Sequence, residues 1–123
     1  RPDTVFTHHK GDLNIDHVLT NQAVLTATRP AGPVRVKKLY AFEVLSSTEA
    51  SFGSLRGFFN PGVFYDVSES FNLKLDAMKV YESELRKFPH PRSLEALTAL
   101  ATTRGAAVSV PKAEAFELLR EVR

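Results

Sequence analysis

The sequence contains no cysteine, and this absence excludes several kinds of protein chemistry at once. Without thiols the chain can form no disulfide, zinc finger or iron–sulfur cluster, and it has no thiol nucleophile. It also lacks an apolar run near the roughly 18 residues of a membrane span, and no signal peptide is visible. We therefore expect a cytoplasmic protein with no membrane span, in which histidine and carboxylate hold any metal.

The chain also lacks a large excess of either positive or negative charge. The chain has 16 basic and 14 acidic residues, which gives a net charge of +2 at pH 7. Residues 1–62 carry 7 basic and 5 acidic side chains, and residues 63–123 carry 9 of each, so neither half is a basic arm. Domains that bind nucleic acid usually concentrate positive charge on one face or segment. We therefore expect no nucleic-acid partner.

The length and the hydrophobic content of the chain are sufficient for one folded domain. The 123 residues are 43% hydrophobic and show no composition break, which indicates a single domain over 1–123. Three segments are rich in β-branched and aromatic residues, as is typical of strands: Thr4–Thr7, the centre of Val36–Val44, and Val63–Val67. Three helices are predicted from apolar residues at helical spacing, beginning after the capping residues Asn14, Ser68 and Ser93.

Proline and glycine predict where these helices end. The first ends at Pro30, which opens a loop over 30–33, and the second ends at the turn 89–91. The second carries a stripe of Phe71, Leu75, Met78, Tyr81 and Leu85. Gly105 is expected just beyond the third helix, and Val108–Val110 is expected to be extended. The long polar connection Leu45–Pro61 is of a kind that is usually functional, and the tail Lys112–Arg123 fits both helix and strand.

The order of strands and helices is that of an α/β fold with a mostly parallel sheet flanked by helices. Three short strands are few for such a sheet, and the chain opens at Arg1 with a strand almost at once. We therefore expect this chain to be part of a larger domain. Its uncovered sheet edges favour self-association, so a homo-oligomer is among the expected partners.

Side chains suited to chemistry gather near the start of the chain. Three of the four histidines and three of the five aspartates lie within the first 17 residues, and all of these except Asp3 follow the first strand. Ligands bind beyond the carboxyl ends of strands in open α/β sheets, and imidazole with carboxylate suits a divalent metal such as zinc. The helix dipole also favours Asp16 in a first helical turn, and His17 can then be an ordinary surface histidine. The pattern alone leaves both interpretations open.

A longer stretch of residues carries a family resemblance. It runs from His8 and His9 through Asp12–His17 and Asn21–Val24 to Ala27–Pro30, and it resembles the second conserved block of LmbE/PIG-L zinc-dependent N-acetyl-sugar deacetylases. Later stretches follow in family order: Glu43-Val44, Ser46–Glu49, Asn60-Pro61, Asp66–Ser68, Lys74, Tyr81–Leu85, Pro89–Ser93, Arg104-Gly105 and Ala113–Phe116. The resemblance covers essentially the whole chain.

The resemblance implies a Rossmann-like α/β fold, of which this chain is the C-terminal part with about three strands and three helices. Family members hold Zn²⁺ with a His and an Asp from an N-terminal His-Pro-Asp-Asp block and with the His of the second block, here His17. The native metal of this chain can be zinc or iron. The first block is absent from these 123 residues. We therefore expect this chain alone to hold little metal and to be inactive, with the missing N-terminal segment as its partner.

The resemblance also implies roles for other side chains. Asp16 would orient a histidine or contact the reacting group. Asn14 stands where many relatives have a histidine that steadies the oxyanion, and an amide can donate a hydrogen bond but carries no proton. Either His8 or His9 takes the cationic role near the substrate, or stabilisation is neutral. Arg92 would hold a phosphate or nucleotide on the substrate, unless it is an ordinary surface arginine.

Two functional classes follow. The first is a zinc-dependent hydrolase that removes the acetyl group from an N-acetylglucosamine-type sugar or sugar conjugate. The alternative is a non-catalytic α/β module that binds sugar or phosphate and derives from the same family.

Overall fold

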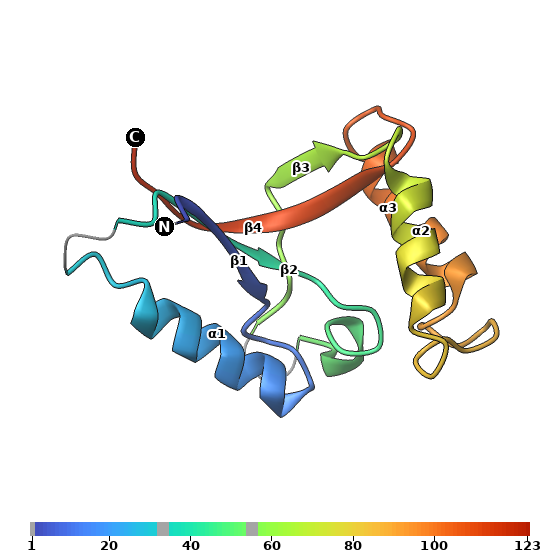
Figure 1. The fold of residues 1–123 in the computed structure, drawn as a ribbon, viewed down its shortest axis with the longest axis horizontal. Helices are drawn as coiled ribbons and strands as arrows, with labels where there is room; N and C mark the ends of the chain where they lie inside the picture. Colours follow the sequence, from blue (N-terminus) through green and yellow to red (C-terminus); the bar gives the residue numbers. More distant parts are fainter. Residues whose placement is uncertain (1, 32–34, 54–56) are drawn as a thin grey trace. The chain divides into compact units, whose positions relative to one another are not determined.

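The computed structural model describes residues 2–31, 35–53 and 57–123. Its elements in chain order are β1 (Thr4–His8), α1 (Ile15–Ala27), β2 (Lys38–Phe42), the short 3-10 helix η1 (Glu49–Ser51), β3 (Val63–Asp66), α2 (Phe71–Val80), α3 (Leu94–Ala106) and β4 (Ala113–Glu121), as Figure 1 shows. The predicted loop over 30–33 and the predicted connection Leu45–Pro61 lie partly outside the described residues.

The four strands form one sheet in the order β1-β2-β4-β3. β1 and β2 are parallel, with Thr4 opposite Lys38, whereas β4 is antiparallel to β2. The α/β class is confirmed, but the sheet is mixed rather than mostly parallel and has four strands rather than three. The reason is the tail, because its alternating buried residues Ala113 and Ala115 belong to strand β4. The Rossmann-like form of the fold stays a prediction.

The chain divides into two compact units, of residues 1–63 with 116–123 and of residues 64–115. The first unit has its core on β2, where Leu39 and Ala41 are fully buried. α1 packs against β1 (Figure 1) and buries Val18. Phe6 of β1 stacks on Tyr40 of β2, with ring centroids 5.3 Å apart. The expectation of a single domain over 1–123 stays a prediction.

Both ends of α1 have side-chain partners. The side chain of Asn14 accepts a hydrogen bond of 2.9 Å from the backbone N–H of Asp16, which confirms the predicted start of the helix. The helix is capped at Thr28, two residues before Pro30. A guanidinium N–H of Arg120 donates to the Thr28 carbonyl at 2.7 Å, so β4 satisfies one of the carbonyls that a helix leaves unpaired at its C-terminus.

In the second unit, α2 begins later and ends earlier than predicted. The Ser68 hydroxyl donates to the Asp66 carboxylate at 2.6 Å and does not cap the helix, which begins at Phe71. α2 ends one residue before Tyr81, and Leu85 lies beyond the helix. The predicted apolar stripe is therefore helical only in its first part.

The start of α3 is as predicted, but its end is not. The Ser93 hydroxyl accepts a hydrogen bond of 3.1 Å from the N–H of Ala96, as expected of a helix cap. Gly105, expected just beyond the helix, is buried inside it, and a Cβ there would lie 2.5 Å from the Val110 carbonyl oxygen. Residues 108–110 form a turn and not an extended segment, so the chain folds back closely onto Gly105.

Candidate functional site

The carboxyl ends of β1 and β2 lie side by side, because the strands are parallel and His8 is opposite Phe42. The two loops that follow these strands are connected to each other by hydrogen bonds. The N–H of Leu13 donates to the Ser47 carbonyl at 3.1 Å, and the N–H of Asn14 donates to the Ser47 hydroxyl at 3.2 Å. This is the edge at which open α/β sheets bind their ligands.

A buried carboxylate holds His17 at this edge. Nδ1 of His17 lies 2.8 Å from Oδ2 of Asp12, and Asp12 is only 2% exposed. The other carboxylate oxygen, Oδ1, accepts a hydrogen bond of 2.6 Å from the Thr48 hydroxyl. The oxygen of that hydroxyl in turn accepts the N–H of Val44 at 2.7 Å. The loop after β2 therefore fixes the Asp12 carboxylate, which in turn holds the imidazole.

The second ring nitrogen of His17 is left for other contacts. Within residues 2–31, 35–53 and 57–123, Nε2 has no hydrogen-bond partner, and the side chain is 18% exposed. When Nδ1 carries the ring proton, Nε2 presents a lone pair that can bind a metal or accept a proton. The geometry therefore suits the ligand role expected of His17, which stays a prediction.

His8 lies flat against His17. The ring centroids are 4.1 Å apart with planes inclined by 23°, and Phe42 packs on His8 at 4.7 Å. Burial lowers the pKa of His8, the nearby His17 lowers it further, and Asp12 acts in the opposite direction. Nδ1 of His8 is buried and has no hydrogen-bond partner in the described part of the chain. These surroundings favour a neutral His8, and so favour neutral stabilisation over a cationic role for this residue.

His9 is enclosed, with 1% exposure. Its Nδ1 lies 2.8 Å from Oε2 of Glu117, and its Nε2 lies 3.4 Å from the Gly57 carbonyl oxygen. Oε1 of the same glutamate accepts the N–H of Asn60 at 2.8 Å. A Cβ at position 11 would lie 2.5 Å from Nε2 of His9, so Gly11 makes room for this ring. Both ring nitrogens of His9 thus face protein atoms, which suits a structural role better than the expected contact with substrate.

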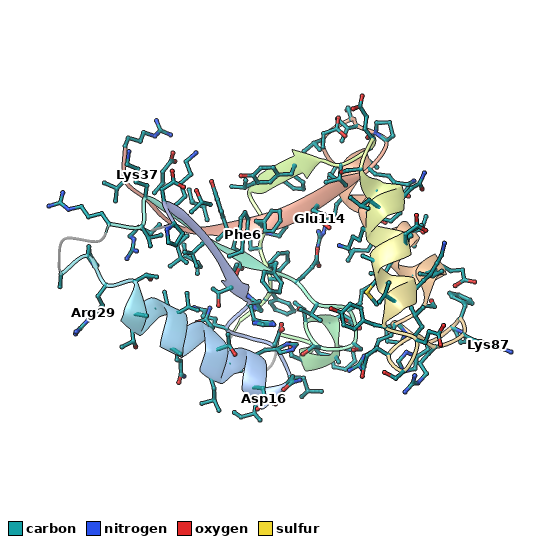
Figure 2. All side chains as sticks on the ribbon, in the orientation of Figure 1. Phe6, Asp16, Arg29, Lys37, Lys87 and Glu114 are labelled. Carbon is teal, nitrogen blue, oxygen red and sulfur yellow. The ribbon has the colours of Figure 1, made fainter. Side chains whose placement is uncertain are left out.

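Asn14 and Asp16, expected to be catalytic, lie at the N-terminal end of α1. Figure 2 labels Asp16 at this end. The side-chain oxygen of Asn14 serves as the helix cap, and the Asp16 carboxylate has no hydrogen-bond partner among the described residues. The carboxylate that contacts His17 is that of Asp12, and the orienting role expected of Asp16 stays a prediction. Contact of Asp16 or of the Asn14 amide N–H groups with a reacting group stays a prediction.

Arg92, expected to bind a phosphate or nucleotide, lies in the second unit. Its guanidinium pairs with Glu84 at 2.5 Å, and its backbone N–H donates to Nδ1 of His90 at 3.0 Å. Its role towards a substrate stays a prediction.

The described residues do not form a complete metal site. No group of three or more histidine or carboxylate side chains in this part of the chain is placed to hold a metal ion. A catalytic zinc usually has three protein ligands and a water. The Nδ1 contact with Asp12 leaves Nε2 of His17 for one such ligand position, and that role stays a prediction.

Comparisons with models of protein families and with curated proteins find no match to this chain. In the part of the chain that the structure describes, no helix is both long and apolar enough to span a membrane.

Proposed function

We propose that this chain supplies the His17 side of the active site of a metal-dependent hydrolase. The reaction would remove the acetyl group from an N-acetylglucosamine-type sugar or sugar conjugate. One observation carries the proposal: Nε2 of His17 has no protein partner among the described residues, while a buried carboxylate 2.8 Å from Nδ1 holds the ring. Metal-binding histidines almost always direct their other ring nitrogen to such a partner.

The substrate class rests on the resemblance of the block from His8 to Pro30 to LmbE/PIG-L deacetylases. The remaining ligands would come from a His-Pro-Asp-Asp segment, which these 123 residues do not contain. A zinc or iron ion bound there would supply the Lewis acid that amide hydrolysis needs. Without that segment, we expect the 123 residues alone to be inactive.

The residues of this chain have separate tasks in the proposal. His17 provides one ligand atom, Nε2. The flat face of His8 lies against His17, and burial lowers the pKa of His8, which disfavours a positive charge beside the ligand. The amide N–H groups of Asn14 can donate to an oxyanion, while its side-chain oxygen caps α1.

The test uses the natural polypeptide that carries residues 1–123. Acetate release from N-acetylglucosamine and its conjugates is measured together with bound zinc and iron, for the wild type, His17→Gln and His90→Gln. His90→Gln is the matched control, because His90 lies in a turn of the second unit. We expect His17→Gln to lose its metal and to reduce the rate at least about 100-fold. Changing a residue that only supports a metal ligand costs up to about 100-fold, and the loss of a ligand should cost at least as much.

A His17→Gln variant that keeps both its metal and its rate would overturn the proposal. If the metal-loaded wild type binds these sugars but releases no acetate, the chain is a non-catalytic sugar-binding module instead.

A further inference from the structure

We propose that Asp12 and Thr48 act as a positioning pair that keeps the ring proton of His17 on Nδ1 and its lone pair on Nε2. Asp12 acts through His17, so it is a positioning residue and not a catalytic one. The tautomer follows from the contacts of this chain. Its consequence for a metal rests on the proposed function.

The contact between His17 and Asp12 sets the position of the proton. A carboxylate only accepts hydrogen bonds, so the Nδ1 that faces Oδ2 at 2.8 Å must donate. The Ser47 hydroxyl oxygen lies 3.3 Å from the same nitrogen, which is a longer contact without a formal charge. The proton therefore stays on Nδ1, and Nε2 keeps its lone pair.

Thr48 decides which carboxylate oxygen faces the imidazole. Its hydroxyl oxygen already accepts the N–H of Val44, which leaves the hydroxyl proton to be donated to Oδ1 of Asp12. This leaves Oδ2 for His17. The orientation of a side chain on α1 is thus set by the loop that follows β2.

The pair is shielded from water, which would otherwise offer alternative partners. Asp12 is 2% exposed and Thr48 is 9% exposed. Hydrogen bonds in such surroundings are stronger than at the surface, and losing one leaves a polar group unpaired. The arrangement therefore has one preferred proton position and not several of similar energy.

An asparagine at position 12 should reverse that proton position. The Thr48 hydroxyl would hold the amide oxygen, and the amide nitrogen would then face Nδ1 of His17 as a donor. Nδ1 would have to accept, and the ring proton would move to Nε2, where it blocks metal binding. If Thr48 is also changed to valine, nothing holds the amide oxygen, so the amide can turn and the proton can return to Nδ1.

The experiment measures ¹⁵N chemical shifts of the histidine rings at a pH where they are neutral, since a protonated ring nitrogen and a bare one have clearly different shifts. His17→Gln identifies the signals of His17. We expect a protonated Nδ1 in the wild type, a protonated Nε2 in Asp12→Asn, and a return to Nδ1 in Asp12→Asn with Thr48→Val. Asp16→Asn is the matched control, because this carboxylate is adjacent to His17 in sequence but makes no hydrogen bond or ion pair with its ring, and we expect the His17 tautomer of this variant to be that of the wild type.

A wild type with its proton on Nε2 overturns the proposal, and this spectrum needs no variant to fold. An unchanged tautomer in Asp12→Asn overturns it as well. A double variant that keeps the proton on Nε2 contradicts the part assigned to Thr48.

A second measurement separates this proposal from the proposed function. In the natural polypeptide, Asp12→Asn should weaken zinc binding about 10- to 100-fold. The expected tautomer in a protein that neither binds zinc nor releases acetate supports the positioning pair and overturns the proposed function. A zinc-dependent deacetylase whose Asp12→Asn variant keeps its tautomer and zinc affinity overturns the positioning pair and leaves the proposed function standing.

Discussion

The imidazole rings of His8 and His17 lie nearly parallel, with their centroids 4.1 Å apart. Two stacked imidazoles cannot both become cations without repulsion, and burial opposes a charge on His8 as well. The stack therefore couples the stability of the first unit to pH.

In the metal-free protein, the contribution of His8 to stability should be lost as the pH falls from about 7 to about 5, the range in which histidine takes up its proton. The pKa of His8 is lower in the folded than in the unfolded chain. The unfolded state therefore binds more protons, and the stability present above pH 6.5 is lost as the pH falls through the folded pKa. The unfolding free energy is measured by urea titration for the wild type and His8→Phe, which keeps a flat ring. We expect the unfolding free energy of the wild type to fall relative to that of His8→Phe as the pH falls. A difference between the two that stays constant with pH would contradict a lowered pKa of His8.

Removing the Glu117 carboxylate should destabilise the protein by about 1–3 kcal/mol. Glu117→Ala leaves Nδ1 of the enclosed His9 and the N–H of Asn60 without their partner. Glu121→Ala on the same strand is the control, because its contact with Arg123 is at the surface, and we expect a change within about 0.5 kcal/mol. Urea unfolding gives both values, and equal values for the two variants would show that the His9 contact contributes nothing.

Substitutions of Asn14 should separate its capping role from a role in catalysis. Asn14→Ala should cost about 0.5–2 kcal/mol because α1 loses its cap, whereas Asn14→Ser keeps a capping oxygen and most of the stability. Serine has no amide N–H to donate to an oxyanion. If Asn14 stabilises an oxyanion, acetate release by the natural polypeptide should fall about 100-fold in Asn14→Ser. A stable Asn14→Ser variant with the wild-type rate limits Asn14 to capping.

Gly105→Ala should destabilise the protein by about 1–3 kcal/mol, although alanine is normally the better helix residue. The added Cβ would lie 2.5 Å from the Val110 carbonyl oxygen and 2.9 Å from backbone atoms of Lys112, none of which can move aside as a side chain does. Gly62→Ala is the control, because a Cβ there meets nothing within 4 Å. Thermal unfolding of both variants checks this, and a stabilised Gly105→Ala would contradict the close approach.

Signals that lie within a few residues of one another were sufficient to predict several elements. The N-caps Asn14 and Ser93 mark the starts of α1 and α3, because a cap bonds to a backbone group two or three residues away. β4 could not be predicted in the same way. Its residues suit a helix as well as a strand, and pairing with β2, far away in sequence, decides between them.

The same distinction explains why the sequence indicated His17 but not its partner. The cluster of histidines and aspartates after the first strand makes His17 a candidate, and the family resemblance gives it the ligand role. Asp12 acquires its role only when the loop after β2 brings Thr48 to within 2.6 Å of it, and the two residues are 36 positions apart. The adjacent Asp16 was the nearer candidate in sequence, but no local pattern could show which carboxylate faces the imidazole.

The most direct test of the account is a crystal of the natural polypeptide that carries residues 1–123, loaded with zinc and examined by anomalous scattering at the zinc edge. The account predicts an anomalous peak at bonding distance from Nε2 of His17, with Nδ1 still bonded to Asp12. A zinc peak away from His17, or one bonded to Nδ1 with the Asp12 contact broken, would contradict it.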